Sequence, residues 1–511
     1  MNKLFLSSLC LTALASCKPG GTGQQDQKPN ILLLYVDDLG YGDIGINGAR
    51  GVQTPNIDRL AENGLLLTDA HCSAATSTPS RYSLLTGSYA FRNNAAILPG
   101  NAPLIIDTAM TTLPDVLRAS GYKTGVVGKW HLGLGLGEMD WNGEICPGPK
   151  DIGFDYSFLL PATGDRVPCV FVENQRVVGL DPADPIRVSY SDKLDGFPTG
   201  TENPELLKMK ADTQHSNTIV NGVSRIGYMS GGRNALWTDE DFPMVFNKKA
   251  IDFIKGCEGQ PFFLYYAFHD IHVPHLPNPA FVGKSSMGPR GDAIAQMDWC
   301  VGQLVSLLEE LGLSENTLVI LTSDNGPVLD DGYEDMAVEM LGDHNPSGPF
   351  RGGKYSAYEA GTRMPTVVYW PGVVEPGVSD ALLSQVDLLA SLAGLVGQNL
   401  KPGVGPDSFN YLDAWLGKSN KGRDILLEEA FTMSLRGGEW KYIHPFKGFT
   451  PEWLANKDIE TGLSGEDQLY NLYQEPGEMF NLAASQIDKV KEMQNILERI
   501  IKEPSRNSEM H

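Results

Sequence analysis

The feature that most constrains the fold of this chain is a pair of unbroken, mainly apolar runs at residues 31–36 and 317–323. Apolar residues that do not alternate with polar ones are typical of a strand buried on both faces of a parallel sheet. Asp37 and Asp38 follow the first run directly, and Asp324 and Asn325 follow the second. The sequence therefore predicts two buried strands that each end in oxygen-bearing side chains.

The segments around these runs alternate between strand-like and helical patterns. Further strands are predicted at residues 123–127, 262–268 and 366–370, and helices at residues 114–119, 245–254 and 294–311. Gly312 follows the last of these helices as its expected C-cap. Alternation of this kind indicates an α/β sandwich with a large, mixed, mainly parallel sheet flanked by helices.

The pattern changes near residues 402–406, where proline and glycine mark a junction. Short strand-like pieces follow at residues 434–443, and apolar residues recur at helical spacing over residues 487–500, with Ser485 and Asp488 placed as a variant capping box. We therefore predict a smaller C-terminal unit with a short antiparallel sheet and a helix. The predicted domains are a main domain at residues 29–405 and a C-terminal subdomain at residues 406–511.

The N-terminus has a basic start and a short apolar run, the pattern of an export signal. Leu14-Ala15-Ser16-Cys17 resembles a bacterial lipobox. We predict a lipoprotein signal peptide at residues 1–17, a lipid anchor on Cys17 and a polar tether at residues 18–28. The protein would then be exported to the periplasm or cell surface of a Gram-negative bacterium. The alternative is a plain secretory signal with an incidental cysteine.

The formal net charge of the 511-residue chain is -23, which argues against non-specific binding to nucleic acid. An anionic substrate would be repelled by this charge and would need a local cluster of cations. Outside the predicted signal peptide the chain has an odd number of cysteines, so at least one is expected to be unpaired. No cysteine and histidine spacing typical of a zinc site is present.

The segment from Ser77 to Gly87 resembles the signature of type I sulfatases, in which a cysteine or serine two positions before a proline is oxidised to formylglycine. Other segments resemble further motifs of the same family. They are residues 128–133, 324–326, 351–354 with Glu359, Gly361, Arg363 and Pro365, 435–442, 469–472, 476–478 and 481–482. The chain is thus similar to arylsulfatase-like type I sulfatases of the alkaline phosphatase superfamily, which implies an alkaline-phosphatase-like sandwich and sulfuric ester hydrolysis.

The resemblance implies that Ser77 becomes formylglycine (3-oxoalanine), made before export by a radical iron-sulfur sulfatase-maturating enzyme. A serine hydroxyl without an adjacent base is a poor nucleophile, whereas a hydrated aldehyde offers two hydroxyl groups. Pro79 and Arg81 would serve recognition by the maturating enzyme, and Arg81 would later hold the aldehyde hydrate. Pro79 also suits the first position of a helix and Gly87 its end, which would place Ser77 at a helix N-terminus, where an anion is favoured.

The acidic pairs would form a metal site with the modified Ser77. Asp37, Asp38, Asp324 and Asn325 offer only oxygen ligands, which suit calcium or magnesium rather than zinc. We expect one calcium ion. Taken singly, an aspartate at the end of a strand is more often a cap or turn residue.

Four cationic or titratable residues would complete the implied catalytic site. Lys129 and Lys354 would place positive charge on sulfate oxygens and so bind the substrate. His272 would bind sulfate and, with Lys354, protonate the departing alcohol, and His131 would take the proton from the second hydroxyl. A lysine taken at random is more often a surface residue.

Loops that the motifs do not specify must determine which glycan is bound, although any single loop residue is as easily structural. The candidate sugar contacts are Asp165, Arg166, His215, Arg225, Arg233, Trp237 and His275, whereas His269 is expected to pack.

A lipid-tethered sulfatase resembles those of glycan-degrading bacteria. The expected substrate is a sulfated host glycan, with galactose or N-acetylgalactosamine sulfate of mucin-type glycans or glycosaminoglycans as the sulfated unit. Two alternatives stay open: a phosphoester or phosphonate hydrolase of the same superfamily, and a non-catalytic surface glycan-binding protein whose Ser77 is never oxidised.

Overall fold

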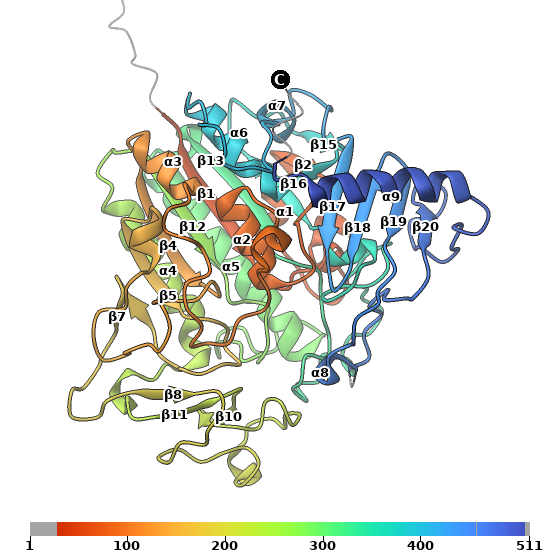
Figure 1. Ribbon diagram of the computed structural model, residues 1–511. Coiled ribbons are helices and arrows are strands. Elements are labelled where there is room, and N and C mark those ends of the chain that lie inside the picture. Colours follow the sequence, from red (N-terminus) through yellow and green to blue (C-terminus); the bar gives the residue numbers. More distant parts are fainter. Residues whose placement is uncertain (1–27, 456, 506–511) are drawn as a thin grey trace, which may run out of the picture.

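The centre of the molecule is a ten-stranded sheet, seen in the computed structural model, which describes residues 28–455 and 457–505 (Figure 1). In spatial order its strands are β15 (Gly377–Ser379), β2 (Leu65–Leu67), β14 (Thr366–Tyr369), β13 (Thr317–Ser323), β1 (Asn30–Val36), β12 (Phe262–Ala267), β4 (Lys123–Lys129), β5 (Tyr156–Leu160), β6 (Val172–Glu173) and β7 (Arg176–Val177). The five strands from β13 to β5 run parallel, whereas β14 is antiparallel to β13 and β6 is antiparallel to β5. The predicted mixed, mainly parallel sheet is confirmed.

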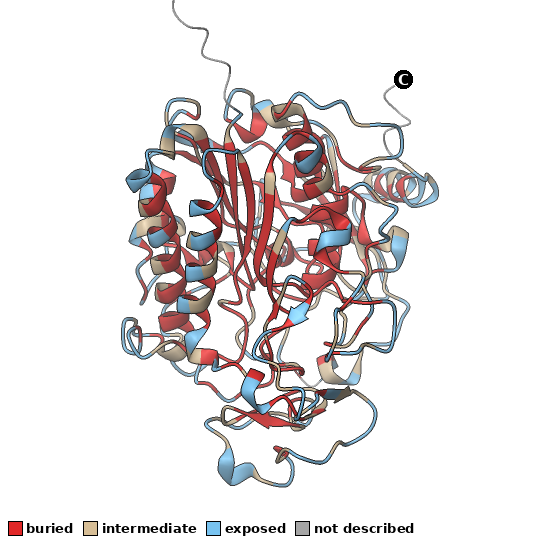
Figure 2. Cartoon of the chain, turned by 90° about the vertical axis from the view of Figure 1, so that its left-hand side faces the viewer, coloured by how far each residue is buried: buried red, intermediate tan, exposed pale blue. Residues whose placement is uncertain are grey.

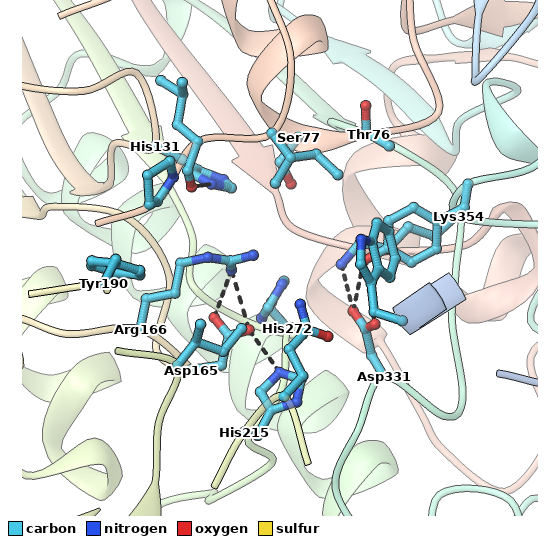
Figure 3. A pocket seen from close by; sticks show the side chains of 17 residues that line it. Thr76, Ser77, His131, Asp165, Arg166, Tyr190, His215, His272, Asp331 and Lys354 are labelled. Atoms are coloured by element: carbon cyan, nitrogen blue, oxygen red, sulfur yellow. Dashed lines mark hydrogen bonds and ion pairs between the residues drawn. The ribbon is translucent and has the colours of Figure 1, made fainter. Parts of the chain in front are cut away.

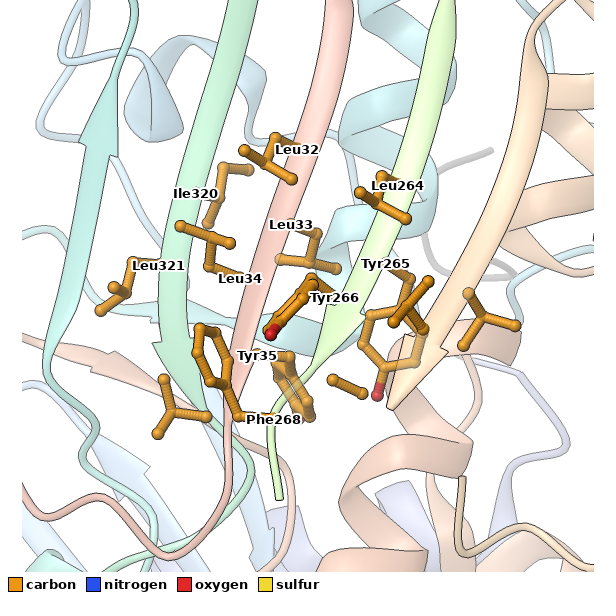
Figure 4. Close-up of a cluster of buried hydrophobic side chains, with 14 of the residues drawn as sticks. Leu32, Leu33, Leu34, Tyr35, Leu264, Tyr265, Tyr266, Phe268, Ile320 and Leu321 are labelled. Carbon is orange, nitrogen blue, oxygen red and sulfur yellow. The ribbon is translucent and has the colours of Figure 1, made fainter. Parts of the chain in front are cut away.

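The two apolar runs form the neighbouring central strands β1 and β13. All seven residues of each strand are buried. Leu33 on β1 lies in register with Tyr265 on β12 and with Ile320 on β13, and their side chains belong to one buried cluster (Figure 4). A strand covered on both faces has no polar side to show to water, which explains why these runs do not alternate.

Helices cover both faces of this sheet (Figures 1 and 2). α1 (Pro55–Glu62), α4 (Phe242–Lys255) and α5 (Gly288–Glu310) pack together in one layer, and α2 (Ser77–Thr86), α3 (Leu113–Ala119) and α6 (Leu388–Leu395) pack together in the other. The predicted helices at 114–119, 245–254 and 294–311 correspond to α3, α4 and the greater part of α5. Gly312 follows α5 with a φ of +66°, as expected near a helix end.

A four-stranded antiparallel sheet lies beside this core, made of β17 (Ile425–Glu429), β18 (Met433–Gly437), β19 (Trp440–Ile443) and β20 (Gln468–Asn471). α9 (Ile487–Lys502) lies across it and buries Val490, Met493 and Leu497 against the sheet (Figure 1). The expected antiparallel sheet and helix are confirmed.

Two details of the C-terminal region need comment. The capping box that we expected at the start of α9 is absent from the described residues, because Gln486 is the N-cap and Ser485 Oγ donates to the Leu482 carbonyl oxygen instead. The predicted domain boundary at residues 405 and 406 falls in the loop between α6 and α7 (Leu412–Trp415) and stays a prediction.

The predicted signal peptide, the lipid site at Cys17 and all but the last residue of the tether lie outside the described residues. Across the described ranges, no helix has the length and apolar character needed to cross a bilayer. The five cysteines that the structure describes, Cys72, Cys146, Cys169, Cys257 and Cys300, are all free thiols, in agreement with the odd count.

The insert between β5 and α4 forms small antiparallel strand pairs beyond the carboxyl ends of the parallel strands (Figure 1). Two pairs contribute most of its regular structure: β8 (Arg187–Ser189) with β11 (Tyr228–Ser230), and β9 (Ile219–Val220) with β10 (Val223–Ser224). In open α/β sheets, ligands bind outside the carboxyl ends of the strands, so this insert lies where a substrate would enter.

Candidate functional site

The carboxyl ends of the parallel strands bring the predicted site residues together. Asp37 and Asp38 follow β1, Asp324 and Asn325 follow β13, and Lys129 is the last residue of β4. Oxygen atoms of Asp37, Asp38 and Asp324 lie within 4.8 Å of one another, and all three side chains are buried. The two acidic pairs therefore form one cluster, which we call the carboxylate cluster.

Ser77 lies against this cluster at the start of α2. Its Oγ is 3.3 Å from Asp37 Oδ1 and 3.2 Å from Asn325 Oδ1, and the residue is 3% exposed. Ser77 lies at the N-terminus of the helix, as expected. Thr76 is the N-cap, so the first helical residue is Ser77, and Pro79 is the third and not the first. Pro79 is still tolerated because backbone N–H groups of the first turn have no intrahelical partner.

Three cations face the carboxylate cluster. Arg81 Nη2 lies 2.7 Å from Asp324 Oδ2, Lys129 Nζ lies 2.5 Å from Asp37 Oδ2, and Lys354 Nζ lies 2.9 Å from Asp38 Oδ2. Lys129 Nζ also donates to Ser77 Oγ at 2.9 Å. These are the local positive charges that an anionic substrate of this acidic protein requires.

The carboxylate cluster fits a hard metal ion. Its donors are oxygen atoms alone, which calcium and magnesium prefer. Burial raises the pKa of Asp37 well above its usual value, even though Lys129 lowers it. A divalent cation would favour the ionised carboxylate that burial disfavours. Asp37, Asp38, Asp324 and Asn325, with the side chain at position 77, are the residues that could hold it.

Two histidines lie beside Ser77 and Lys354. His131 Nε2 is 3.0 Å from the Leu98 carbonyl oxygen, and its Nδ1 has no hydrogen-bond partner among the described residues. His272 Nδ1 is 2.7 Å from the Val273 carbonyl oxygen and must therefore carry a proton, which leaves Nε2, 3.8 Å from Asp38 Oδ2, as the reactive nitrogen. Burial, followed by the charges of Lys129 near His131 and Lys354 near His272, lowers both pKa values well below the usual value.

A cavity of about 240 Å³ opens over these groups (Figure 3). Ser77, His131, His272 and Lys354 line the part that faces the carboxylate cluster. The remaining polar lining includes three of the candidate sugar contacts, Asp165, Arg166 and His215.

These three side chains form a hydrogen-bonded wall of the cavity. Arg166 Nη1 is 2.9 Å from Asp165 Oδ1, and His215 Nε2 is 3.1 Å from Asp165 Oδ2 (Figure 3). His215 Nδ1 lies 2.7 Å from Asp212 Oδ1. Burial opposes the charged form of His215, but the hydrogen bonds to Asp165 and Asp212 outweigh it and raise the pKa. This wall therefore presents a fixed array of donors and acceptors.

The other candidate sugar contacts do not line the cavity. His275 is buried, with one ring nitrogen on Asp335 and the other 2.8 Å from the Ile271 carbonyl oxygen, so its expected sugar contact has no geometric support. Arg225 pairs with the buried Asp239, and Arg233 pairs with Asp184. Trp237 packs against aromatic rings, as His269 does against Phe242. Local sequence could not separate these residues from true lining residues.

Several lining residues were missed from the sequence. Asp331 Oδ2 accepts a hydrogen bond from Lys354 Nζ at 2.8 Å, opposite the contact of that lysine with Asp38. Residues without a predicted role also line the cavity, namely Thr76, Ile97, Leu98, Pro99, Tyr190, Gln214, Ile226, Tyr355 and Trp453. Tyr355 is adjacent to the lysine motif, which was an available signal, but no local pattern marks Asp331 or Trp453.

Known proteins with similar sequence and structure agree with this geometry. The family model described as Sulfatase matches residues 29–398. The chain is 51% identical to N-acetylgalactosamine-6-O-sulfatase of Bacteroides thetaiotaomicron over 94% of each chain, and 33% identical to human arylsulfatase A over 89% of this chain and 83% of the relative.

Solved structures give the same result. A protein described in connection with the metabolism of multiple glycosaminoglycans by Bacteroides thetaiotaomicron superimposes with a TM-score of 0.91 at 51% identity, over 93% of this chain and 99% of the other. The family match, the carboxylate cluster with its cations and the serine in the signature position all point to the same family. The chain belongs to the sulfatase family and is a sulfuric ester hydrolase.

Proposed function

We propose that this sulfatase removes the 6-O-sulfate of N-acetylgalactosamine in mucin-type glycans or glycosaminoglycans. The observation that carries this proposal is the 51% identity, along nearly the whole of both chains, to a protein named N-acetylgalactosamine-6-O-sulfatase. The cavity supports it, because a polar wall made of Asp165, Arg166 and His215 faces the space beside Ser77 and offers both donors and acceptors to sugar hydroxyl groups.

We infer that Ser77 is converted to formylglycine, the modification general to this family. A hydrated aldehyde at position 77 would supply one hydroxyl to attack sulfur and a second whose ionisation releases the product. Ser77 suits this role because its Oγ contacts Lys129, Asp37 and Asn325 at the start of a helix. A radical iron-sulfur maturating enzyme would act on the chain before export.

We assign the carboxylate cluster to one calcium ion. When bound to Asp37, Asp38, Asp324 and Asn325, calcium would supply positive charge to the sulfate and to the side chain at position 77. Magnesium is the other hard cation that these oxygen donors suit.

Three cationic side chains would bind the sulfate group and position the carboxylate cluster. Lys129 and Lys354 lie on either side of the cluster, so their ammonium groups can hold two sulfate oxygens and offset the charge that develops in the transition state. Arg81 keeps Asp324 in place through two hydrogen bonds to its Oδ2 atom.

The two histidines are placed for proton transfer. His272 presents Nε2 to the cavity because Nδ1 donates to the Val273 carbonyl oxygen. The charge of the bound sulfate would favour the protonated ring, so Nε2 would take up a proton when the substrate binds and pass it to the departing sugar oxygen. His131 has a neutral ring with an unshared Nδ1 among the described residues and would accept a proton on the Ser77 side. Overall, one ester and one water give one alcohol and one sulfate.

The location of the protein is part of the proposal. Export under a lipoprotein signal, with an anchor on Cys17, would hold the enzyme in the periplasm or on the cell surface of a Gram-negative bacterium, where large glycans are first met. The chain motif that supports this is Leu14-Ala15-Ser16-Cys17.

The test is sulfate release by protein made with and without a sulfatase-maturating enzyme. Peptide mass spectrometry should show that residue 77 loses two hydrogens only with the maturating enzyme, and Ser77→Ala serves as the inactive control. The matured protein should release sulfate from N-acetylgalactosamine-6-sulfate and not from the 4-sulfate or from the corresponding 6-phosphate.

Other outcomes would contradict the proposal in different ways. Faster turnover of the phosphate would favour a phosphoester or phosphonate hydrolase. Unmodified Ser77 in protein from the native host, together with glycan binding and no sulfate release, would favour a non-catalytic glycan-binding protein. Release from the 4-sulfate alone would keep the sulfatase and change the sulfated position.

A further inference from the structure

One lining residue of the cavity comes from a distant part of the chain. Trp453 lies on the short helix α8 (Glu452–Ala455), between β19 and β20, whereas the other residues that line the cavity belong to residues 76–355. The indole is half-buried and contacts Tyr355 with ring centroids 5.1 Å apart and Phe431 with centroids 6.2 Å apart. Two aromatic neighbours thus hold the ring, and part of its surface stays open to the cavity.

The same segment is attached to both sides of the cavity through Lys457. Its Nζ lies 3.4 Å from Asp331 Oδ1 and 3.6 Å from Asp212 Oδ2, and the residue is buried. Asp331 in turn binds Lys354, and Asp212 binds His215. Lys457 therefore links the segment that carries Trp453 to the carboxylates that orient one sulfate-binding lysine and one side chain of the polar wall.

We propose that Trp453 is a specificity-determining residue that receives the apolar face of the sugar ring. A pyranose has polar hydroxyl edges and a face made of C–H groups, and an aromatic ring is the surface that such a face covers best. Asp165, Arg166 and His215 supply polar partners in the same cavity. The volume of about 240 Å³ is below the roughly 300 to 1,000 Å³ typical of drug-sized ligands. A single sugar ring would therefore reach both the indole and the polar wall.

This inference rests on the proposed carbohydrate substrate, but it is separable from the chemistry at Ser77. The indole is anchored on Tyr355 and Phe431, neither of which belongs to the carboxylate cluster. Its loss should therefore weaken binding of the sugar without changing binding of the sulfate group alone.

The experiment measures binding to the full chain with unmodified Ser77, which binds without turnover. The probes are N-acetylgalactosamine-6-sulfate and inorganic sulfate, measured by calorimetry for the wild type, Trp453→Ala and Trp453→Phe. We expect Trp453→Ala to bind the sugar sulfate roughly tenfold more weakly, because apolar area that the sugar covered is lost. Inorganic sulfate should bind equally well, and Trp453→Phe should keep most of the affinity.

Phe449→Ala is the matched control, because Phe449 is an aromatic residue of the same connection that is 99% exposed and does not line the cavity. Equal affinity of the wild type and Trp453→Ala for the sugar sulfate would overturn the inference. Equal loss of both probes would also overturn it, because Trp453 would then act only by supporting Tyr355 and Lys354. If Trp453→Ala does not fold, Trp453→Phe is compared with Trp453→Leu. Only the aromatic variant should then retain affinity for the sugar sulfate, and equal affinities would overturn the inference.

The two proposals fail in different ways. If the wild type binds inorganic sulfate and galactose-6-sulfate but not the N-acetylgalactosamine ester, the proposed substrate is wrong, and the same variants are then compared on galactose-6-sulfate. If matured wild type releases sulfate from N-acetylgalactosamine-6-sulfate while Trp453→Ala keeps full affinity, the function stands and the role of Trp453 is wrong.

Discussion

At the scale of single residues, the site depends on carboxylates that hold cations in place. Lys354 Nζ lies between Asp38 and Asp331, at 2.9 Å and 2.8 Å, and Lys129 Nζ lies between Asp37 and Ser77. A lysine side chain is flexible, so a buried ammonium group stays in one position only when fixed acceptors surround it. Asp331 is thus a positioning residue for Lys354.

The variant Asp331→Asn tests this role. It keeps the shape of the side chain but removes one charged acceptor of Lys354, and hydrogen bonds to charged groups contribute about 1.5 to 3 kcal/mol. We expect kcat/KM for the sulfated sugar to fall by roughly 10- to 100-fold, mostly through KM. Asp330→Asn, at an exposed neighbouring position, is the control and should behave as wild type. An unchanged KM in Asp331→Asn would contradict the assignment.

At the scale of elements, α2 is held at both ends by other parts of the chain. Its N-terminus presents Ser77 to the carboxylate cluster, and its C-terminus ends at Gly87, which has a φ of +63°. A Cβ atom at Gly87 would approach Gly405 Cα to 2.8 Å. The end of α2 therefore requires glycine for conformation and for a close backbone approach.

Gly87→Ala and Gly312→Ala separate these two requirements. Both glycines follow helices at similar φ, but a Cβ at Gly312 meets no atom within 4 Å. We expect Gly312→Ala to lower the free energy of unfolding by about 1 kcal/mol through backbone strain, and Gly87→Ala to lower it by a further ~1 to 3 kcal/mol through the clash. Urea unfolding measures both, and equal losses would contradict the packing argument.

β17 holds the segment that leads into α2. The Glu429 backbone N–H donates to the Ser73 carbonyl oxygen at 2.9 Å, and the Ala75 N–H donates to the Glu429 carbonyl oxygen at 2.7 Å. The Glu429 side chain is buried near Phe91, and burial raises its pKa to about 8. The second sheet thus holds the segment that leads into α2 through the backbone of Glu429. The carboxyl group of the same residue accepts from the Phe91 backbone N–H.

Because the pKa of Glu429 is raised in the folded chain, we expect the difference in free energy of unfolding between Glu429→Gln and the wild type to depend on pH. Below pH about 4.5 the carboxyl group of Glu429 is protonated in both the folded and the unfolded chain. As pH rises towards 8, the unfolded chain ionises while the folded chain does not, so wild-type stability falls by about 1.4 kcal/mol per unit of pKa difference. Glutamine cannot ionise, so the variant should gain stability relative to wild type between pH 5 and pH 8 in urea unfolding. A pH-independent difference would show that Glu429 is ionised when folded.

At the scale of the whole molecule, the protein carries a formal net charge of -23. At the site, however, three cationic side chains contact three buried carboxylates. The site joins segments that are far apart in sequence, since Asp37 follows β1 and Asp324 follows β13, two strands that are neighbours in the sheet. A metal ion bound there would join these strand ends and so stabilise the whole sheet.

Calcium should therefore raise the midpoint of thermal unfolding, by an amount that corresponds to about 2.7 kcal/mol when its concentration is 100 times Kd. A chelator should reverse the shift and abolish sulfate release by the matured enzyme. Asp38→Ala should remove the shift, whereas Asp58→Ala, a change outside the carboxylate cluster, should retain it. A shift that persists in Asp38→Ala would place the ion elsewhere.

The local sequence was enough to predict the central strands and several of the flanking helices, and the resemblance to a known family supplied the candidate catalytic residues. Each of these depends on residues that are close in the chain: a continuous apolar run, a helical repeat, or a motif such as the segment that begins at Ser77. A strand buried on both faces must be apolar throughout, and the ends of such strands were visible as acidic pairs. The five parallel strands then brought these pairs together.

Only the tertiary structure decided which loop residues line the cavity. Asp165, Arg166 and His215 do, whereas His275, Arg225, Arg233 and Trp237 do not, although all seven are polar or aromatic residues in similar contexts. Asp331 and Trp453 carried no local signal, because their roles arise from contacts with Lys354 and Tyr355. The sequence by itself determined the central strands and the acidic pairs at their carboxyl ends, since those follow from short-range patterns. The polar wall of the cavity was decided by packing between distant segments, which no short-range pattern encodes.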